Sequence, residues 1–327
     1  MTPKLPQAEL HTHLGASVDP PVLWSLAHTQ GIKLPCKDYW DFEDMITMRG
    51  VEHNINLDEM HNNFYHWTEL IQSSPFAVEE SVKSVIGGGY RKCNLILQEL
   101  RLNPMFRNRG GEQDLDHIIT AALRGMDKAT LEYPRVKAGI ILMMDRTLPF
   151  AHNQIILEKA KKYQHRGIIG VDLAGPQRNK FSIKKHASLF HEARQAGLGL
   201  TIHSGEEGSL EELKYVVDTI RPNRIGHGLL CVQDKETIKT IKENNITLEI
   251  CITSNLRNQK VKNINEMKYI INTLVQNDIK FTINTDGPEM YQTNIYEEQQ
   301  FAIKNKIATK KQISNCIKNA FTSTFIK

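Results

Sequence analysis

Short apolar runs rich in β-branched residues recur along the chain, and polar or glycine-containing residues typical of turns follow each one. Eight such runs predict strands, and their order along the chain leaves gaps of variable length between them. The predicted strands are Ala8 to Leu14, Leu95 to Leu102, Val136 to Met143, Ile168 to Leu173, Leu198 to His203, Arg224 to His227, Ile246 to Ile250 and Ile279 to Asn284.

Helix-like patterns fill most of these gaps, and each is long enough for the crossover between two parallel strands. They cover Gln113 to Glu132, Asn153 to His165, Ile183 to Ala196, Leu210 to Thr219, Lys235 to Asn244 and Asn265 to Asn277. Strands that alternate with helices eight times predict an α/β fold, a (β/α)₈ TIM barrel, with residues 1–327 as a single domain. The alternative, an open doubly wound sheet, would normally carry a glycine-rich phosphate loop after its first strand, where this chain has His-Thr-His-Leu-Gly.

The stretch of residues 35–90 is too long for a simple connection between a strand and a helix. We expect it to form extra helices over the barrel mouth, as a lid. Its aromatic residues fit such a lid, although packing in an ordinary core explains each of them as well. Gly87, Gly88 and Gly89 suggest a flexible break before the second strand.

Composition narrows the class of protein. The chain has 327 residues, 40% hydrophobic and 24% charged, as is usual for a globular protein with a large core. The net charge of +4 is spread along the chain, which favours a solvated surface over nucleic-acid binding. The N-terminus lacks an apolar signal-peptide core, and no stretch approaches the roughly 18 apolar residues of a membrane span, so we expect a cytoplasmic protein without membrane contact.

The five cysteines are odd in number and widely spaced, and they contain no Cys-x-x-Cys pair. Neither a disulfide framework nor a cysteine zinc site is indicated, and we expect reduced, mostly buried thiols.

Candidate chemistry gathers at the ends of the predicted strands. His11 and His13 lie two apart in the first strand, so both imidazoles point to the same face. His203 ends the fifth strand, His227 lies in the sixth, and Asp286 follows the eighth. Asp-Gly-Pro by itself is typical of a turn. In a barrel, however, the carboxyl ends of all the strands meet at one mouth.

Three imidazoles and one carboxylate suit one Zn²⁺ ion with a bound water, and zinc can bring the pKa of that water close to 7. Asp286 could bind the metal and also accept a hydrogen bond from the water, while His227 would act as the base that orients it. Glu206, three residues after His203, would face the substrate from the other side and donate a proton. A helix N-terminus rich in acids is the alternative for Glu206 and is the preferred explanation for Glu207.

With these residues in place, the chain resembles the adenosine deaminase family of the amidohydrolase superfamily along nearly its whole length. The matching segments are Glu9 to Leu14, Glu99 to Pro104, Val171 to Gly175, His203 to Glu206, Arg224 to Gly228, Thr253 to Asn255 and Asn284 to Asp286. The resemblance implies zinc ligation by the residues His11, His13, His203 and Asp286. It also implies proton donation to a purine ring nitrogen by Glu206, orientation of the water by His227, and a backbone hydrogen bond from Gly175 to the other edge of the purine.

The implied reaction is hydrolytic deamination of adenosine or deoxyadenosine to inosine or deoxyinosine, with release of ammonia. The expected partner is thus a small purine nucleoside and not a polynucleotide.

Two positions depart from the family pattern. Gly287 stands where a second consecutive Asp usually forms a hydrogen bond at purine N7, and Gly15 stands where an Asp usually meets the ribose 5′-hydroxyl. Loss of a charged hydrogen-bond partner costs on the order of 1.5 to 3 kcal/mol, enough to change substrate preference. Glu289 or a water could replace the missing carboxylate, and Gly15 could make room for a larger 5′ substituent.

Other functions therefore stay open. Within the same chemistry, the substrate could be adenine or a 5′-modified adenosine such as methylthioadenosine or aminodeoxyfutalosine. A protein that binds nucleosides without turning them over is a further alternative. Amidohydrolases that act on amides usually bridge two metals with a carboxylated lysine, and no lysine is so placed here. The sequence does not indicate an oligomeric state.

Overall fold

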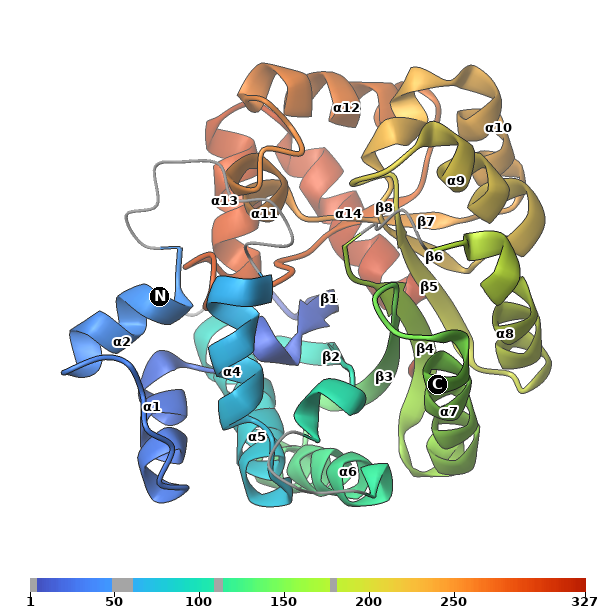
Figure 1. Cartoon of the computed structure of the whole chain (residues 1–327). Helices are drawn as coiled ribbons and strands as arrows, with labels where there is room; N and C mark the ends of the chain where they lie inside the picture. Colours follow the sequence, from blue (N-terminus) through green and yellow to red (C-terminus); the bar gives the residue numbers. More distant parts are fainter. Residues whose placement is uncertain (1–4, 49–60, 109–113, 177–180) are drawn as a thin grey trace.

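The computed structural model describes residues 5–48, 61–108, 114–176 and 181–327. Eight parallel strands follow one another around a barrel in the order of the sequence (Figure 1). They are β1 (Gln7–His13), β2 (Leu95–Leu102), β3 (Lys137–Asp145), β4 (Ile168–Ala174), β5 (Gly199–Ser204), β6 (Arg224–His227), β7 (Thr247–Ile250) and β8 (Phe281–Ile283). The predicted TIM barrel is confirmed, and each predicted strand end lies within two residues of the observed one.

The barrel closes between its first and last strands. Thr12 and Asp286 form a parallel bridge just beyond the end of β8. The amide of Asp286 donates to the carbonyl of His11 at 2.9 Å, and the amide of His13 donates to the carbonyl of Asp286 at 2.8 Å. Because these bonds flank the bridge, closure of the barrel fixes Asp286 beside the two histidines of β1.

Helices surround the strands (Figure 1). The six predicted crossover helices are present as α6 (Leu115–Glu132), α7 (Phe150–Tyr163), α8 (Ile183–Gln195), α9 (Leu210–Tyr215), α10 (Lys235–Glu243) and α12 (Ile264–Gln276). Helix α7 begins three residues earlier than predicted, directly after Pro149. Helix α9 is shorter than predicted, because a π-helical turn, η5 (Val216–Ile220), takes over from it.

Three further helices were not predicted from the sequence: α11 (Ile252–Arg257), α13 (Ile295–Lys304) and α14 (Lys310–Ser323). A capping box between Thr309 and Gln312 begins α14. This helix packs against β8 and β1, so it covers the seam at which the barrel closes.

The stretch between β1 and β2 is helical where the structure describes it. It holds α1 (Pro20–Thr29), α2 (Tyr39–Ile46), a π-helical turn η2 (His61–Tyr65), α4 (His66–Ile71) and α5 (Pro75–Cys93). Part of the predicted lid, residues 49–60, lies outside the described residues. Of its aromatic residues, Phe42 and Phe64 are buried, whereas Trp40 is exposed.

The expected break at Gly87 to Gly89 is wrong, because α5 runs through all three glycines. Their role is close packing. A Cβ at Gly87 would lie 2.9 Å from the ring of Tyr133, and one at Gly89 would lie 2.7 Å from the side-chain oxygen of Gln98. The glycines therefore let α5 approach its neighbours closely.

Charged side chains fill the barrel interior below the mouth. Arg101 donates to Asp172 at 2.9 Å and to Glu249 at 3.0 Å, while Arg224 bonds Glu249 and Glu99, each at 2.5 Å. All five side chains are fully buried or nearly so. Each charge has an opposite partner, as burial in a low-dielectric interior requires.

All five cysteines lie in the described part of the chain and are free thiols, four of them buried, as expected. Among the described helices, none is long and apolar enough to cross a membrane.

Candidate metal centre and substrate pocket

Four ligand atoms converge at the carboxyl ends of the strands. The Nε2 atom of His13 lies 3.3 Å from that of His11 and 3.1 Å from that of His203. The Oδ1 atom of Asp286 lies 3.5 Å from Nε2 of His11 and 3.3 Å from Nε2 of His13. The structure thus brings together the four residues expected to bind metal, although hundreds of positions separate the first from the last.

These separations fit a tetrahedral zinc site. Ligands about 2.0 to 2.1 Å from a central zinc ion lie roughly 3.4 Å from one another. The ligand atoms of His227 and Cys251 also come within 4.8 Å of some members of this set. We prefer the set of three histidines and Asp286, because its spacings match the tetrahedron.

Two buried carboxylates orient the imidazoles. Nδ1 of His11 lies 2.7 Å from Glu249, and Nδ1 of His203 lies 3.1 Å from Asp172. Donation of Nδ1–H to a carboxylate leaves Nε2 as the lone-pair nitrogen that faces the cluster. The charged network inside the barrel therefore fixes both rings for metal binding, and Arg101 holds both carboxylates in turn.

The protonation states also suit a cation. Burial, with nearby positive charges, holds the pKa of His13 well below its usual value, so its ring is neutral. Burial by itself would raise the pKa of Asp286, but the neighbouring imidazoles of His11, His13 and His227 hold it well below its usual value. Neutral imidazoles and an ionised carboxylate are the forms that bind zinc.

Local backbone geometry aims these side chains. Asp286 has φ 65° and His227 has φ 62°, both in the left-handed region that non-glycine residues seldom adopt. A Cβ at Gly226 would lie 3.1 Å from the His11 ring and 3.2 Å from the His203 ring. Glycine at this position of β6 therefore leaves room for both imidazoles.

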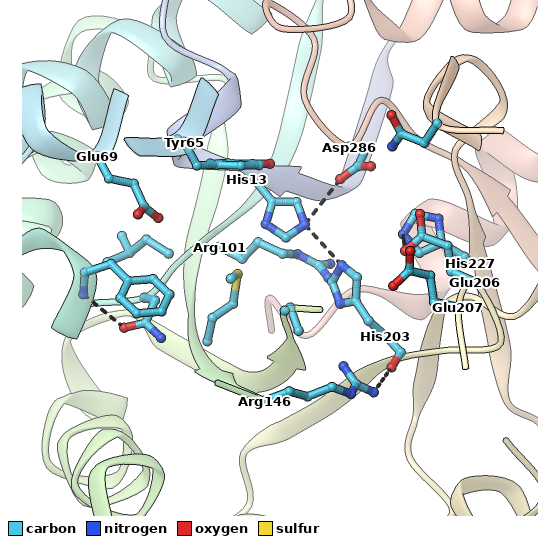
Figure 2. Close-up of a pocket in the computed structure, with 18 of the residues that line it drawn as sticks. His13, Tyr65, Glu69, Arg101, Arg146, His203, Glu206, Glu207, His227 and Asp286 are labelled. Atoms are coloured by element: carbon cyan, nitrogen blue, oxygen red, sulfur yellow. Dashed lines mark hydrogen bonds and ion pairs between the residues drawn. The ribbon is translucent and has the colours of Figure 1, made fainter. Parts of the chain in front are cut away.

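His227 and Glu206 lie together next to the cluster (Figure 2). Nε2 of His227 is 3.4 Å from Glu206, and the Asn255 amide contacts its Nδ1 at 3.0 Å. Because Asn255 holds one ring nitrogen, the other faces Glu206 and the metal ligands. His227 and Glu206 are thus placed so that one could hold a water and the other could meet a substrate.

Ser254 supports Asp286 from the opposite side of the carboxylate. Its hydroxyl donates to Oδ2 of Asp286 at 2.5 Å. Oδ1 therefore remains directed toward the histidines. Asn258 donates to the Tyr291 hydroxyl at 2.8 Å, and both of these residues line the pocket.

A pocket opens over the four ligand atoms. Gly175, Glu206 and His227 line it, together with His13, His203 and Asp286. At Gly175, φ is 90° and a Cβ would run into the carboxylate of Asp145, so only glycine fits this turn. Glu207 also lines the pocket and pairs with Lys260. Its expected place at a helix N-terminus is wrong, because α9 begins at Leu210 with Ser209 as its cap.

The sequence analysis missed several residues of this pocket. Arg146 donates to the carbonyl of His203 and to Glu212, and Tyr65, Glu69 and Arg107 line the wall across from Glu206. These four residues carry no sequence motif; they reach the pocket only through the arrangement of loops.

Glu289 does not join this group. Its carboxylate forms an ion pair with Lys92 at 2.6 Å, and it lines a second pocket beside α5. The interpretation of Glu289 as a replacement for the missing carboxylate is therefore wrong.

Gly15 lines the pocket, but the space beside it is filled. A Cβ at Gly15 would lie 2.9 Å from the ring of Tyr65. The expected extra room at this position is absent. Gly287 packs against Ala16 instead of lining the pocket.

The comparisons with known proteins agree with this geometry. The family model described as adenosine deaminase matches residues 6–327. An adenosine deaminase of Clostridium kluyveri is 30% identical over 321 residues, which cover 98% of this chain and 90% of the relative.

Solved structures share the fold at low identity. An adenine deaminase from Arthrobacter aurescens is 18% identical with a TM-score of 0.85, covering 98% of this chain and 94% of the other. The Arabidopsis N6-mAMP deaminase is 21% identical with a TM-score of 0.84, covering 99% and 94%. A zinc-bound amidohydrolase from Burkhoderia ambifaria is 19% identical with a TM-score of 0.85, covering 99% and 86%. With a family model matched from end to end, the chain belongs to the adenosine deaminase family and is a hydrolytic purine deaminase.

Proposed function

We propose that this protein deaminates adenosine and deoxyadenosine with one Zn²⁺ ion per chain. The convergence of the four ligand atoms carries the proposal: Nε2 of His13 lies 3.3 Å from Nε2 of His11 and 3.1 Å from Nε2 of His203, and Oδ1 of Asp286 lies 3.5 Å from Nε2 of His11 and 3.3 Å from Nε2 of His13. Support for the metal also comes from the related fold that was solved with bound Zn. Support for adenosine comes from the curated relative, whose name is adenosine deaminase.

In this proposal His11, His13, His203 and Asp286 hold the metal. When bound, zinc makes hydroxide available near neutral pH. Asp286 orients the attacking water by accepting its hydrogen bond, and His227 holds the water on the same side of the pocket through Nε2, because the Asn255 amide occupies its Nδ1. The water then adds to the carbon that carries the exocyclic amine.

Glu206 acts on the other side of the same carbon. Its carboxyl group donates a proton to the adjacent purine ring nitrogen, so the ring can accept the electron pair as the water adds. The backbone N–H of Gly175 holds the far edge of the base. A proton then passes from the added hydroxyl to the amino group, the C–N bond breaks, and ammonia leaves, so the ring carries oxygen in place of nitrogen.

The neutral substrate distinguishes this proposal from that of a nucleotide deaminase. The Arabidopsis neighbour is an N6-mAMP deaminase. In the present pocket, however, each of the arginines Arg101, Arg107 and Arg146 has a carboxylate partner. Paired arginines favour an uncharged nucleoside over a phosphate.

A deaminase assay with adenosine, deoxyadenosine, adenine, methylthioadenosine and aminodeoxyfutalosine tests the proposal. We expect adenosine and deoxyadenosine to react best, and chelation of the metal to abolish turnover until zinc is returned. Higher kcat/KM for any other member of the panel would overturn the substrate, and activity that survives full metal removal would overturn the metal. A cytoplasmic location stays a prediction from the sequence.

A further inference from the structure

The pocket has a second polar end around Glu69. Figure 2 shows Glu69 across the pocket from Glu206 and His227, with the Tyr65 ring between Glu69 and Asp286 and its hydroxyl on the side of Asp286. The side chains of Leu102, Phe106 and Met143 line the pocket as well. A flat base can lie along this apolar wall with its reactive carbon near His227, so that the rest of the substrate extends toward Glu69.

Three separate elements meet at this end, against the backbone of Gly15. Tyr65 comes from η2, Glu69 from α4, and Arg107 from a short 3₁₀ helix after β2, η3 (Met105–Arg107). A Cβ at Gly15 would lie 2.9 Å and 3.0 Å from two ring carbons of Tyr65, and 3.3 Å from Nη2 of Arg107. The absence of a side chain at position 15 is what allows both groups to approach.

The polar groups at this end are buried and balanced in charge. Arg107 and Glu69 are 2% and 6% exposed, and Nη1 of Arg107 lies 3.7 Å from Oε1 of Glu69. Arg107 also donates to the carbonyl of Asn103 at 3.1 Å. Glu69 can accept hydrogen bonds, while Arg107 and the Tyr65 hydroxyl can donate them. This combination matches the hydroxyl groups of a neutral sugar.

We propose that Tyr65, Glu69 and Arg107 form the sugar subsite of this enzyme, and that the Tyr65 hydroxyl binds the substrate's 5′-hydroxyl in place of a side chain at Gly15. The proposal rests on the proposed nucleoside deaminase function and names the residues that determine its substrate. The phenolic hydroxyl of Tyr65 can donate a hydrogen bond to that group. Glu69 keeps the subsite neutral and disfavours a 5′-phosphate.

Adenosine and 5′-deoxyadenosine differ only in the 5′-hydroxyl, and Tyr65→Phe removes only the phenolic oxygen. We expect the wild-type enzyme to prefer adenosine in kcat/KM. Tyr65→Phe should lower kcat/KM for adenosine by about 3- to 10-fold, the loss of one neutral hydrogen bond, and leave 5′-deoxyadenosine unchanged. Tyr269→Phe, at an exposed position of α12, is the matched control.

Equal losses of kcat/KM on both substrates would mean that Tyr65 acts structurally. No loss on either substrate would mean that Tyr65 does not touch the 5′ end. Each result overturns the subsite. A wild-type enzyme that prefers 5′-deoxyadenosine overturns it too. If neither nucleoside reacts, the proposed function itself has failed, which is a distinguishable outcome.

A second variant tests the role of charge. Glu69→Gln removes the negative charge that lies beside Arg107, so the ratio of kcat/KM for AMP to that for adenosine should rise by about 10-fold, the gain expected from a charge-assisted hydrogen bond. Far-UV circular dichroism should show that the variant folds. A folded variant whose AMP to adenosine ratio stays at the wild-type value would contradict the sugar subsite.

Discussion

The methyl group of Ala16 occupies the space into which a side chain at position 287 would extend. A Cβ at Gly287 would lie 2.5 Å from the Cβ of Ala16, and Ala16 is 3% exposed. Both residues lie near proposed metal ligands in the sequence, since Gly287 follows Asp286 and Ala16 lies three residues after His13. The missing second carboxylate is therefore part of a packing arrangement between the two loops and not an isolated change.

Restoring the carboxylate alone should fail. Gly287→Asp is expected to lower the free energy of unfolding by about 1 to 3 kcal/mol, because the new Cβ overpacks against Ala16. Ala16→Gly in the same chain should recover most of that loss. Urea unfolding of the two single variants and the double variant gives the coupling energy, which we expect to be at least about 1 kcal/mol. Additive effects would show that the two positions do not compete for space.

Replacement of Glu206 should separate proton donation from binding. Glu206→Gln keeps the shape of the side chain but cannot donate the carboxyl proton, so kcat for adenosine should fall by about 10²- to 10⁴-fold. Glu207→Gln is the matched control, because the Glu207 carboxylate is next to Glu206 in the sequence but pairs with Lys260. This variant should lose far less kcat. Comparable losses in the two variants would remove the assigned role from Glu206.

Asp172 should tune metal affinity without touching the metal. Its carboxylate accepts from Nδ1 of His203 and from Arg101. In Asp172→Asn the ring loses its orienting charge, and affinity for zinc should fall by about 10- to 100-fold. Competition with a chromophoric chelator measures this, with the exposed Asp218→Asn as control. Wild-type affinity in Asp172→Asn would show that the contact does not orient the ligand.

Glu298 should make stability depend on pH. Burial raises the pKa of Glu298 from 4.5 to about 7, although hydrogen bonds from Thr253 and Thr293 act to lower it. Between these two values the folded protein keeps a proton that the unfolded chain has released, so the free energy of unfolding falls as pH rises.

Glu298→Gln cannot titrate, and its stability relative to wild type should therefore increase by about 3 kcal/mol between pH 4.5 and pH 7 and stay constant above. Urea unfolding of both proteins at a series of pH values measures this difference. A difference that does not vary with pH would mean that Glu298 ionises normally in the folded protein.

Much of the barrel could be predicted because its strands are local patterns. Each run of β-branched residues by itself indicates a buried strand, and the alternation of these runs with helices indicates that the strands are parallel. The helices after β8 escaped prediction, since no following strand requires a crossover there. The glycines of α5 misled the prediction because a glycine needed for close packing looks the same in sequence as one needed for flexibility.

The metal ligands could be predicted for a related reason. His11 and His13 share a face because of the two-residue period of a strand, and His203, His227 and Asp286 lie at strand ends that a barrel must bring together. By contrast, Glu289 was assigned by its distance along the chain, and its true partner, Lys92, lies 197 positions away.

The sequence by itself determined the barrel and the meeting of His11, His13, His203, His227 and Asp286 at its mouth, because strand periodicity and parallel topology convert local positions into a shared site. Only the tertiary structure decided what surrounds that site. Tyr65 fills the space beside Gly15, and Ala16 fills the space beside Gly287. Such contacts join loops with no common period or register, and the shape of the substrate pocket depends on how those loops pack.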